Sequence, residues 1–582
     1  MTVDEPSRNS TRVVGVPPLF WMLGLLVVVS FAVRLAALKF WGTGTISADS
    51  AEYASIAENL RKGIGYVGIA TPGLELNLPP LFPLLIAAAS FVTKSYSDAG
   101  RLVSIVFGTL LPLPVFGIAS RLFNRRTAWV AAALAIFHPV LVNLSFTVWS
   151  EGPYATLLLT AVYVVLRALE RSTTRKWALV GVILGLAYLI RQEAAAPMLL
   201  AVVFQVTSTE GSLALKAKRA IVALAVFAAL ITPEVMFLYR STGTVRLEGK
   251  SAMLFYLSNR VFAAQASLEG NRSSTDRGDQ MSSLPNVESW EPWTVKWASS
   301  AINADLQPTG VWMRPNEDVI RETHPTPKLL VQVVRTAVRL NAPKFLEALS
   351  SKWLGAPFLS ALALLGVVRR PWRRPLASKC LFVMLVPALA IVATFSNILN
   401  VSRFYFVLIP FLLIWAANGL VQVGHWAMTT SAAAACGWLS PAAAAWIVPG
   451  LLALGMIIYS VNAVRGLYEF LSDSSYTLID RQVGLWIHKQ QEDPVRIMDL
   501  QLNIAFEGDE QFVNFPYCSA DLALRFLDSA KVDYVVLRPS ERFTKYYQDW
   551  VTNGIPDPRA KLVYVTSGTN ADQILVYHWQ RR

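Results

Sequence analysis

Apolar runs of about 20 residues recur along this chain of 582 residues, and each is long enough to cross a membrane as a helix. Hydrophobic residues make up 54% of the sequence and charged residues only 16%, which is more apolar surface than soluble cores can bury. We therefore predict a polytopic α-helical membrane protein with about 11–13 transmembrane helices. The candidate spans are 18–40, 101–121, 127–147, 150–169, 177–191, 193–207, 220–239, 352–368, 378–397, 403–421 and 443–462.

The basic residues gather in short stretches between these runs: Arg8/Arg12, Arg121/Arg125/Arg126, Arg167/Arg171/Arg175/Lys176, Lys216/Lys218/Arg219 and Arg369/Arg370/Arg373/Arg374/Lys379. Together with the few acids beside them, these clusters carry the whole formal net charge of +13. All of them fall on one side if the predicted spans cross the membrane, and the positive-inside rule makes that side cytoplasmic. The N-terminal residues 1–17 are thus expected in the cytoplasm, and the charge requires no nucleic-acid partner.

Outside the transmembrane domain 18–462, this topology places the tail 463–582 on the outer side, together with the loops 41–78 and 240–351 of that domain. The apolar segment 79–93 is short and rich in proline, and a crossing there would invert the charge rule, so we predict a re-entrant or membrane-surface segment. The tail alternates helical and β-branched stretches, which predicts an extracytoplasmic α/β domain. Its expected elements are 479–490, 495–498, 520–531, 534–537, 542–552, 562–565 and 574–577.

The first outer loop contains a candidate juxtamembrane helix with two acids near its start. Apolar residues recur at helical spacing from Ala51 to Leu60, Ser47 is a candidate cap, and Gly63 marks an end. Asp49 and Glu52 are three positions apart, so both project from neighbouring positions on one face. These acids either complement the helix dipole on a solvated surface or carry chemistry.

Three further charged residues are assigned to the same side. Glu151 lies in the turn before one span, Arg191 at the break between two short spans, and Arg403 at the outer start of another. Snorkelling to the interface is the ordinary explanation for arginines near helix ends. Beside carboxylates, the same guanidinium groups would bind a phosphate in bidentate fashion.

The order of these features resembles the GT-C superfamily of membrane glycosyltransferases, specifically the bacterial relatives of dolichyl-phosphate-mannose protein mannosyltransferases and of the lipid A aminoarabinose transferase. The resemblance is carried by Asp49-Ser-Ala-Glu52-Tyr53, Ala57-Glu-Asn-Leu60, Gly63-Ile-Gly-Tyr66, Pro79-Pro-Leu-Phe-Pro83, Trp149-Ser-Glu151, Arg191-Gln-Glu193 and Arg403-Phe-Tyr405 with Pro410. It implies a bacterial cytoplasmic membrane enzyme that uses a polyprenyl-phosphate sugar donor on the outer face, with Asp49 as the catalytic carboxylate.

Two departures from the family pattern limit what the resemblance implies. Ser50 follows Asp49 where many relatives have Asp-Glu, so the second acidic role passes to Glu52 or is lost. Asn77-Leu78 precedes the proline pair where relatives of the aminoarabinose type place a lysine, so the identities of donor and acceptor do not transfer.

The chemistry of the residues agrees with this resemblance. An acceptor hydroxyl that attacks an anomeric carbon needs a carboxylate to take its proton, and the leaving phosphate needs positive charge. We assign catalysis to Asp49, Glu52 and Glu151, and phosphate binding to Arg191, Arg403 or a divalent cation, with Tyr53 and Glu193 as further candidates. One base in a single displacement predicts inversion.

The predicted function is thus sugar transfer from a polyprenyl phosphate to an extracytoplasmic lipid, glycan or protein. The alternatives are a transporter or flippase of amphiphilic or glycolipid substrates, in which the same charges line a pathway, and a non-catalytic scaffold that displays the α/β tail. The five histidines show no metal-ligand spacing.

Overall fold

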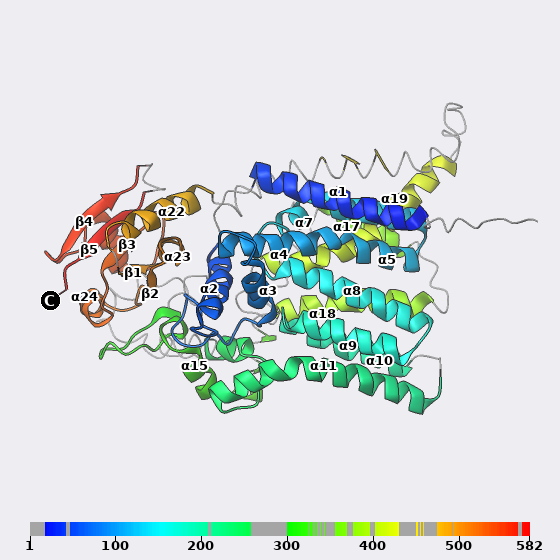
Figure 1. The fold of residues 1–582 in the computed structure, drawn as a ribbon, viewed down its shortest axis with the longest axis horizontal. Helices are drawn as coiled ribbons and strands as arrows, with labels where there is room; N and C mark the ends of the chain where they lie inside the picture. The colour runs from blue at the N-terminus through cyan, green and yellow to red at the C-terminus, as the bar shows by residue number, and fades with distance from the viewer. Residues whose placement is uncertain are drawn as a thin grey trace, which may run out of the picture.

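The structure is a computed structural model, and the residues it describes are 18–41, 47–207, 211–257, 299–324, 356–368, 376–395, 402–429, 474–491, 493–567 and 573–581, with isolated positions between 326 and 343 and between 450 and 458. Long helices form a bundle, and a small sheet domain lies at one end of it (Figure 1). The bundle helices are α1 (Pro18–Trp41), α4 (Tyr96–Leu110), α5 (Pro112–Leu122), α6 (Arg125–Phe137), α8 (Glu151–Glu170), α9 (Thr174–Tyr188), α10 (Ala195–Thr207), α11 (Leu213–Thr242), α17 (Ala356–Val368), α18 (Leu376–Phe395) and α19 (Ile409–Thr429).

Within the described ranges, five helical stretches are long and apolar enough to cross a membrane: Phe20–Phe40, Tyr96–Leu122, Glu151–Glu170, Leu213–Thr242 and Tyr405–Trp426. Shorter apolar helices, such as Gln192–Thr207, pack among them. The predicted fold class, a mostly helical membrane protein with a C-terminal α/β domain, is confirmed. The predicted span 443–462 lies almost wholly outside the described residues.

One predicted span is wrong as a continuous helix. The segment 127–147 breaks after Phe137, and the short helix α7 (Pro139–Asn143) follows. Pro139 disfavours helical backbone at the residue before it, and His138 is accordingly extended, with φ −64° and ψ 119°.

The basic clusters meet at one end of the bundle. Glu170, at the end of α8, accepts from Arg121 of α5 at 2.8 Å and from Lys379 of α18 at 2.9 Å. The break between α9 and α10 and the start of α8 lie at the opposite end, beside α2 (Ala48–Lys62) and α3 (Leu81–Ala89) (Figure 1). With nine residues, α3 rises only about 14 Å and is too short to span, as predicted for the segment that contains it.

The tail forms a five-stranded sheet with the order β2-β1-β3-β5-β4. Strand β1 pairs in parallel with β2 and β3, whereas β5 is antiparallel to both β3 and β4. The elements are α22 (Ser474–His488), β1 (Arg496–Asp499), α23 (Asn503–Gly508), β2 (Gln511–Asn514), α24 (Ala520–Ser529), β3 (Tyr534–Leu537), α25 (Lys545–Asn553), β4 (Ala560–Val565) and β5 (Leu575–Trp579). The sequence interpretation missed α23 and β2, which are short and carry polar residues at their ends.

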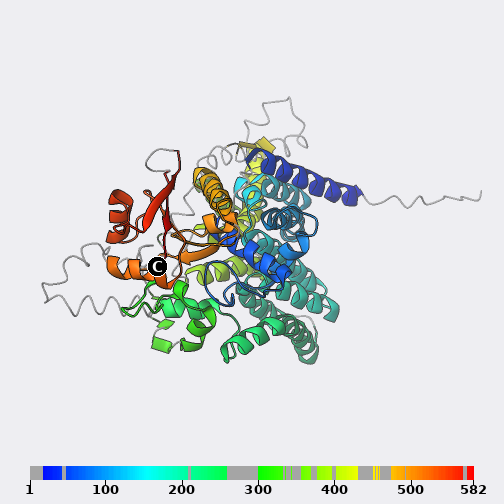
Figure 2. The ribbon, with the colours of Figure 1, turned by 60° about the vertical axis from the view of Figure 1, so that its left-hand side comes forward.

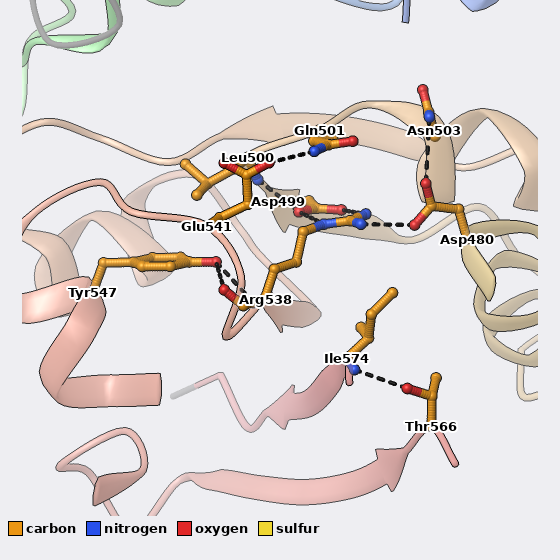
Figure 3. Close-up of polar contacts among 10 residues, drawn as sticks. All are labelled: Asp480, Asp499, Leu500, Gln501, Asn503, Arg538, Glu541, Tyr547, Thr566 and Ile574. Atoms are coloured by element: carbon orange, nitrogen blue, oxygen red, sulfur yellow. Dashed lines mark hydrogen bonds and ion pairs between the residues drawn. The ribbon is translucent and has the colours of Figure 1, made fainter. Parts of the chain in front are cut away.

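A buried ion-pair network joins three elements of this domain (Figure 3). Arg538, just after β3, bonds Asp499 at the end of β1 through two nitrogens, at 2.9 and 2.7 Å, and Asp480 of α22 at 2.7 Å. All three side chains are fully buried. The network fixes the ends of two parallel strands, and therefore the loop that leaves β1 at Leu500.

The α/β domain packs against the same end of the bundle as α2 (Figures 1 and 2). Leu502, in the loop after β1, is 7% exposed and joins the main hydrophobic core of the bundle. Phe506 of α23 and Phe512 of β2 pack against that core as well. The domain is therefore positioned to contribute to whatever site lies at this end.

Candidate active site

A cavity of about 420 Å³ opens where α2, the 70–78 loop, the start of α8 and the α/β domain meet. Its walls combine four carboxylates, two cations and several aromatic rings. The charged and aromatic lining residues are Asp49, Glu52, Glu75, Glu151, Arg191, Lys250, Tyr53, Trp149 and Trp312. The structure thus brings together the predicted residues Asp49, Glu52, Tyr53, Glu151 and Arg191.

Helix α2 presents Asp49 at its N-terminal turn. Ser47 precedes the helix with extended backbone, but its hydroxyl does not cap the helix as predicted. Instead it lies 2.9 Å from the Ser50 hydroxyl and accepts from Trp149 Nε1 at 2.8 Å, which ties the helix start to the segment before α8. Asp49 is exposed and lines the cavity.

Glu52, one turn further along α2, is held differently from Asp49. Its side chain is buried, and Oε2 accepts from the backbone N–H groups of Ile69 at 3.0 Å and Ala70 at 2.8 Å. A β-carbon on Gly68 would lie 1.6 Å from Oε1, so the loop passes directly over the carboxylate. Burial, and then the charge of Glu75, raise the pKa of Glu52 to about 8. Glu52 therefore anchors a loop, and its surroundings favour the protonated form.

Arg191 is paired with two carboxylates. It donates to Glu151 at 2.9 Å and to Glu193 at 3.0 Å. Its side chain is 12% exposed and that of Glu151 is 3% exposed. The guanidinium also lies 5.9 Å from the centre of the Tyr154 ring. Two carboxylates therefore offset its single charge, and its predicted role in phosphate binding stays a prediction.

Tyr53 and Arg403 complete the predicted set. The Tyr53 ring packs edge-on against Phe82 of α3 at 4.9 Å, and burial raises the pKa of its hydroxyl further above the ordinary value, so it stays neutral. Arg403 falls in the backbone of η4 (Ser402–Leu408), but its side chain lies outside the described residues. Its predicted role in phosphate binding therefore stays a prediction.

Sequence reasoning missed Lys250 in the cavity wall. It begins the helix that follows the 243–249 loop, where Gly249 packs against Leu76 so closely that a β-carbon would lie 2.1 Å from the Leu76 carbonyl oxygen. Burial lowers the pKa of Lys250. A lone lysine in a long polar loop gives no signal in sequence, because only the fold brings it to the cavity.

Glu75 was missed as well. One carboxylate oxygen accepts from the backbone N–H groups of Asn77 and Leu78, and the other accepts from Asn316 of α15 (Asn316–Glu322) at 3.3 Å. Burial raises its pKa. This acid shapes the turn before the proline pair.

Across the described ranges, no three His, Cys, Asp or Glu side chains gather closely enough to hold a metal ion. Among the acids of the cavity, Glu52 and Glu75 accept from backbone N–H groups, and Glu151 pairs with Arg191. The arrangement instead supports proton transfer at Asp49 and binding of an anion near Lys250.

Part of the bundle matches a known protein family. Residues 77–237 match the family model for dolichyl-phosphate-mannose-protein mannosyltransferases, a segment that includes Glu151, Arg191 and Glu193 but not Asp49. No curated protein compared with the chain matches its sequence significantly.

Solved structures share the fold across nearly the whole chain. ArnT from Cupriavidus metallidurans has a TM-score of 0.55 at 12% identity, and the match covers 96% of this chain and 98% of ArnT. The same enzyme bound to undecaprenyl phosphate gives 0.53 at 13%, with coverage of 96% and 98%. The oligosaccharyltransferase of Archaeoglobus fulgidus, tethered to an acceptor peptide, gives 0.55 at 13%, over 97% of this chain and 74% of that protein.

The family match covers the middle of the bundle, and the shared fold extends to the α/β domain. Residues 77–237 are therefore similar to the mannosyltransferase family, and the chain as a whole shares the fold of ArnT, in agreement with the resemblance that the order of its sequence motifs carries.

Proposed function

We propose that this protein transfers one sugar from a polyprenyl phosphate to a lipid, glycan or protein acceptor, with inversion at the anomeric carbon. The observation that carries the proposal is a single cavity lined by both an exposed carboxylate, Asp49, and a cation, Lys250. The undecaprenyl phosphate bound by the structurally similar ArnT supports a donor of this class.

The reaction is a single displacement. The acceptor hydroxyl oxygen forms a bond to the anomeric carbon while the bond from that carbon to the phosphate oxygen breaks. Asp49 takes the hydroxyl proton, and general-base assistance of this kind contributes about 10²–10⁴-fold. The bonding electron pair leaves with the polyprenyl phosphate, whose charge Lys250 stabilises.

The Glu151–Arg191–Glu193 group orients this site. Its ion pairs tie the start of α8 to the break between α9 and α10. We assign Glu151 and Glu193 to holding Arg191, and Arg191 to a supporting position beside the phosphate. A divalent cation could assist the leaving group, but the steps above require only residues of the chain.

The cavity is proposed to face the outer side of a bacterial cytoplasmic membrane, with the α/β domain also outside. Arg121 and Lys379 belong to two of the basic clusters, and both bond Glu170 at the opposite end of the bundle. The positive-inside rule makes that end cytoplasmic. The same assignment leaves residues 1–17 in the cytoplasm.

The test uses the purified full chain in lipid vesicles, supplied with a panel of radiolabelled polyprenyl-phosphate sugars and a membrane extract as acceptor. Transfer of label is expected from one donor, with the product carrying the opposite anomeric configuration. Asp49→Asn keeps the shape, removes the base, and should lower turnover by about 10²–10⁴-fold while polyprenyl phosphate still binds. Glu52→Gln should cost less. Near wild-type turnover by Asp49→Asn, or retention of configuration, would contradict the mechanism.

A further inference from the structure

We propose that the C-terminal α/β domain contributes a positioning residue, Asn514, that holds two walls of the active-site cavity together and orients the loop on which Glu52 depends. Asn514 ends β2, far from the bundle in sequence. Its side chain bonds backbone carbonyls of the cavity wall and is assigned no contact with the substrate. The effect of Asn514 on sugar transfer rests on the function proposed above.

The first step is the contact itself. Asn514 Nδ2 donates to the carbonyl of Ala70 at 3.1 Å and to the carbonyl of Trp312 at 3.2 Å. Ala70 and Trp312 both line the cavity, one from the loop after α2 and the other from η3 (Val311–Met313). One side chain of the α/β domain therefore joins two separate backbone segments of the cavity wall.

The second step is what Ala70 does on its other side. Its N–H group donates to Glu52 Oε2 at 2.8 Å, beside the bond from Ile69. The loop at 69–70 is thus clamped between Glu52 of α2 and Asn514 of β2. Because the Ala70 N–H group is held on one side and its carbonyl on the other, the backbone at Ala70 has little freedom to rotate.

Within the α/β domain, the strand that carries Asn514 is held by its neighbours. β2 pairs with β1 in register, Asn514 opposite Asp499, and Arg538 holds Asp499 through two hydrogen bonds (Figure 3). Leu502, in the loop after β1, reaches the same cavity. The α/β domain therefore forms one wall of the site, and pairing with β1 holds the strand that ends in Asn514.

The test measures amide hydrogen exchange of the 66–74 segment in the full-length protein. Asn514→Leu removes both donated hydrogen bonds and should speed exchange at Ile69 and Ala70 by about tenfold, the effect of losing one to two net hydrogen bonds. Gln511→Leu is the matched control, because Gln511 lies on the same strand but is exposed, and its side-chain oxygen accepts a hydrogen bond from Arg496. It should leave the 66–74 segment unchanged. Equal exchange in wild type and Asn514→Leu would overturn the proposal.

Asn514→Asp gives a second, isosteric test. The ionised carboxylate cannot donate to the two carbonyls, but the protonated acid can donate to one. The turnover of Asn514→Asp relative to wild type should therefore be about tenfold low at neutral pH and recover as the pH falls, with the donor KM little changed. A constant ratio across pH would count against positioning by hydrogen bonds.

The two measurements separate the claims. If wild type transfers no sugar, the proposed function fails while the exchange experiment still decides whether Asn514 clamps the loop. If Asn514→Leu unfolds the domain, seen as fast exchange in 534–537, the exchange comparison is made with Asn514→Asp. Faster exchange at 69–70 without loss of turnover would refute the catalytic part of the proposal.

Discussion

The guanidinium of Arg191 lies 2.9 Å from the carboxylate of Glu151, in an ion pair that the fold almost completely buries. The same arginine bonds Glu193, so its charge is offset before any substrate binds. The cavity is therefore lined by a buried ion pair, Glu151 with Arg191, and by two further charged residues that we propose to meet the substrate, Asp49 and Lys250.

The Glu151–Arg191 pair should be strongly coupled in stability. Arg191→Gln leaves Glu151 buried without its cation, which should cost roughly 3–5 kcal/mol of unfolding free energy. Adding Glu151→Gln to Arg191→Gln should recover part of that loss, because the uncompensated charge is gone. Unfolding in detergent for both single variants and the double variant measures the coupling; additive losses would show that the pair does not interact as described.

Lys250 should bind the donor phosphate. Lys250→Met should weaken the binding of polyprenyl phosphate by roughly 10–100-fold, the effect of losing one hydrogen bond to a charged group. Lys250→Arg keeps the charge and should retain most of the affinity. Binding is measured with unglycosylated polyprenyl phosphate, so no knowledge of the sugar is required. Lys561→Met, on exposed β4, is the control, and an equal loss there would point to a non-specific charge effect.

Glu52 should make stability depend on pH in a defined direction. Its folded pKa of about 8 lies above the ordinary value of 4.5, so the folded protein holds the proton more tightly. Its contribution to stability is therefore fully present below about pH 4.5 and is lost as the pH rises to about 8. Glu52→Gln cannot ionise, so its melting temperature relative to wild type should rise between pH 5 and 8 and then level off. A difference that stays flat across this range would show that Glu52 is ionised throughout.

Arg538 should be essential to the α/β domain. Arg538→Met leaves Asp480 and Asp499 buried without their cation and should cost at least roughly 3–5 kcal/mol. Exchange should accelerate in 496–499 and 534–537, the strands that the network joins. Arg481→Met is the control, because Arg481 is half exposed and meets Glu507 only at 3.6 Å, so its loss should cost less than about 1 kcal/mol. Unchanged exchange in Arg538→Met would contradict the structural role assigned to the network.

Much of the fold followed from local sequence. Apolar runs and basic clusters indicated the bundle and its two ends, and β-branched stretches indicated most of the tail, with β3 (Tyr534–Leu537) placed at its observed bounds. The failures were local too: Pro139 broke one span, and β2 was too short and polar to show a strand pattern. The packing of the α/β domain against the bundle could not be read from any local pattern, because it depends on contacts between distant segments.

The candidate site divides in the same way. The sequence by itself determined that a carboxylate, Asp49, begins a helix just after the first span, and that Glu151 and Arg191 lie at the same end of the bundle, because helical spacing and charge placement act over a few residues. Only the tertiary structure decided that Arg191 is offset by two acids, that Glu52 and Asn514 bond the same loop, and that Lys250 and Glu75 line the cavity. Those roles depend on burial and on distances between segments far apart in the chain, which no local pattern encodes.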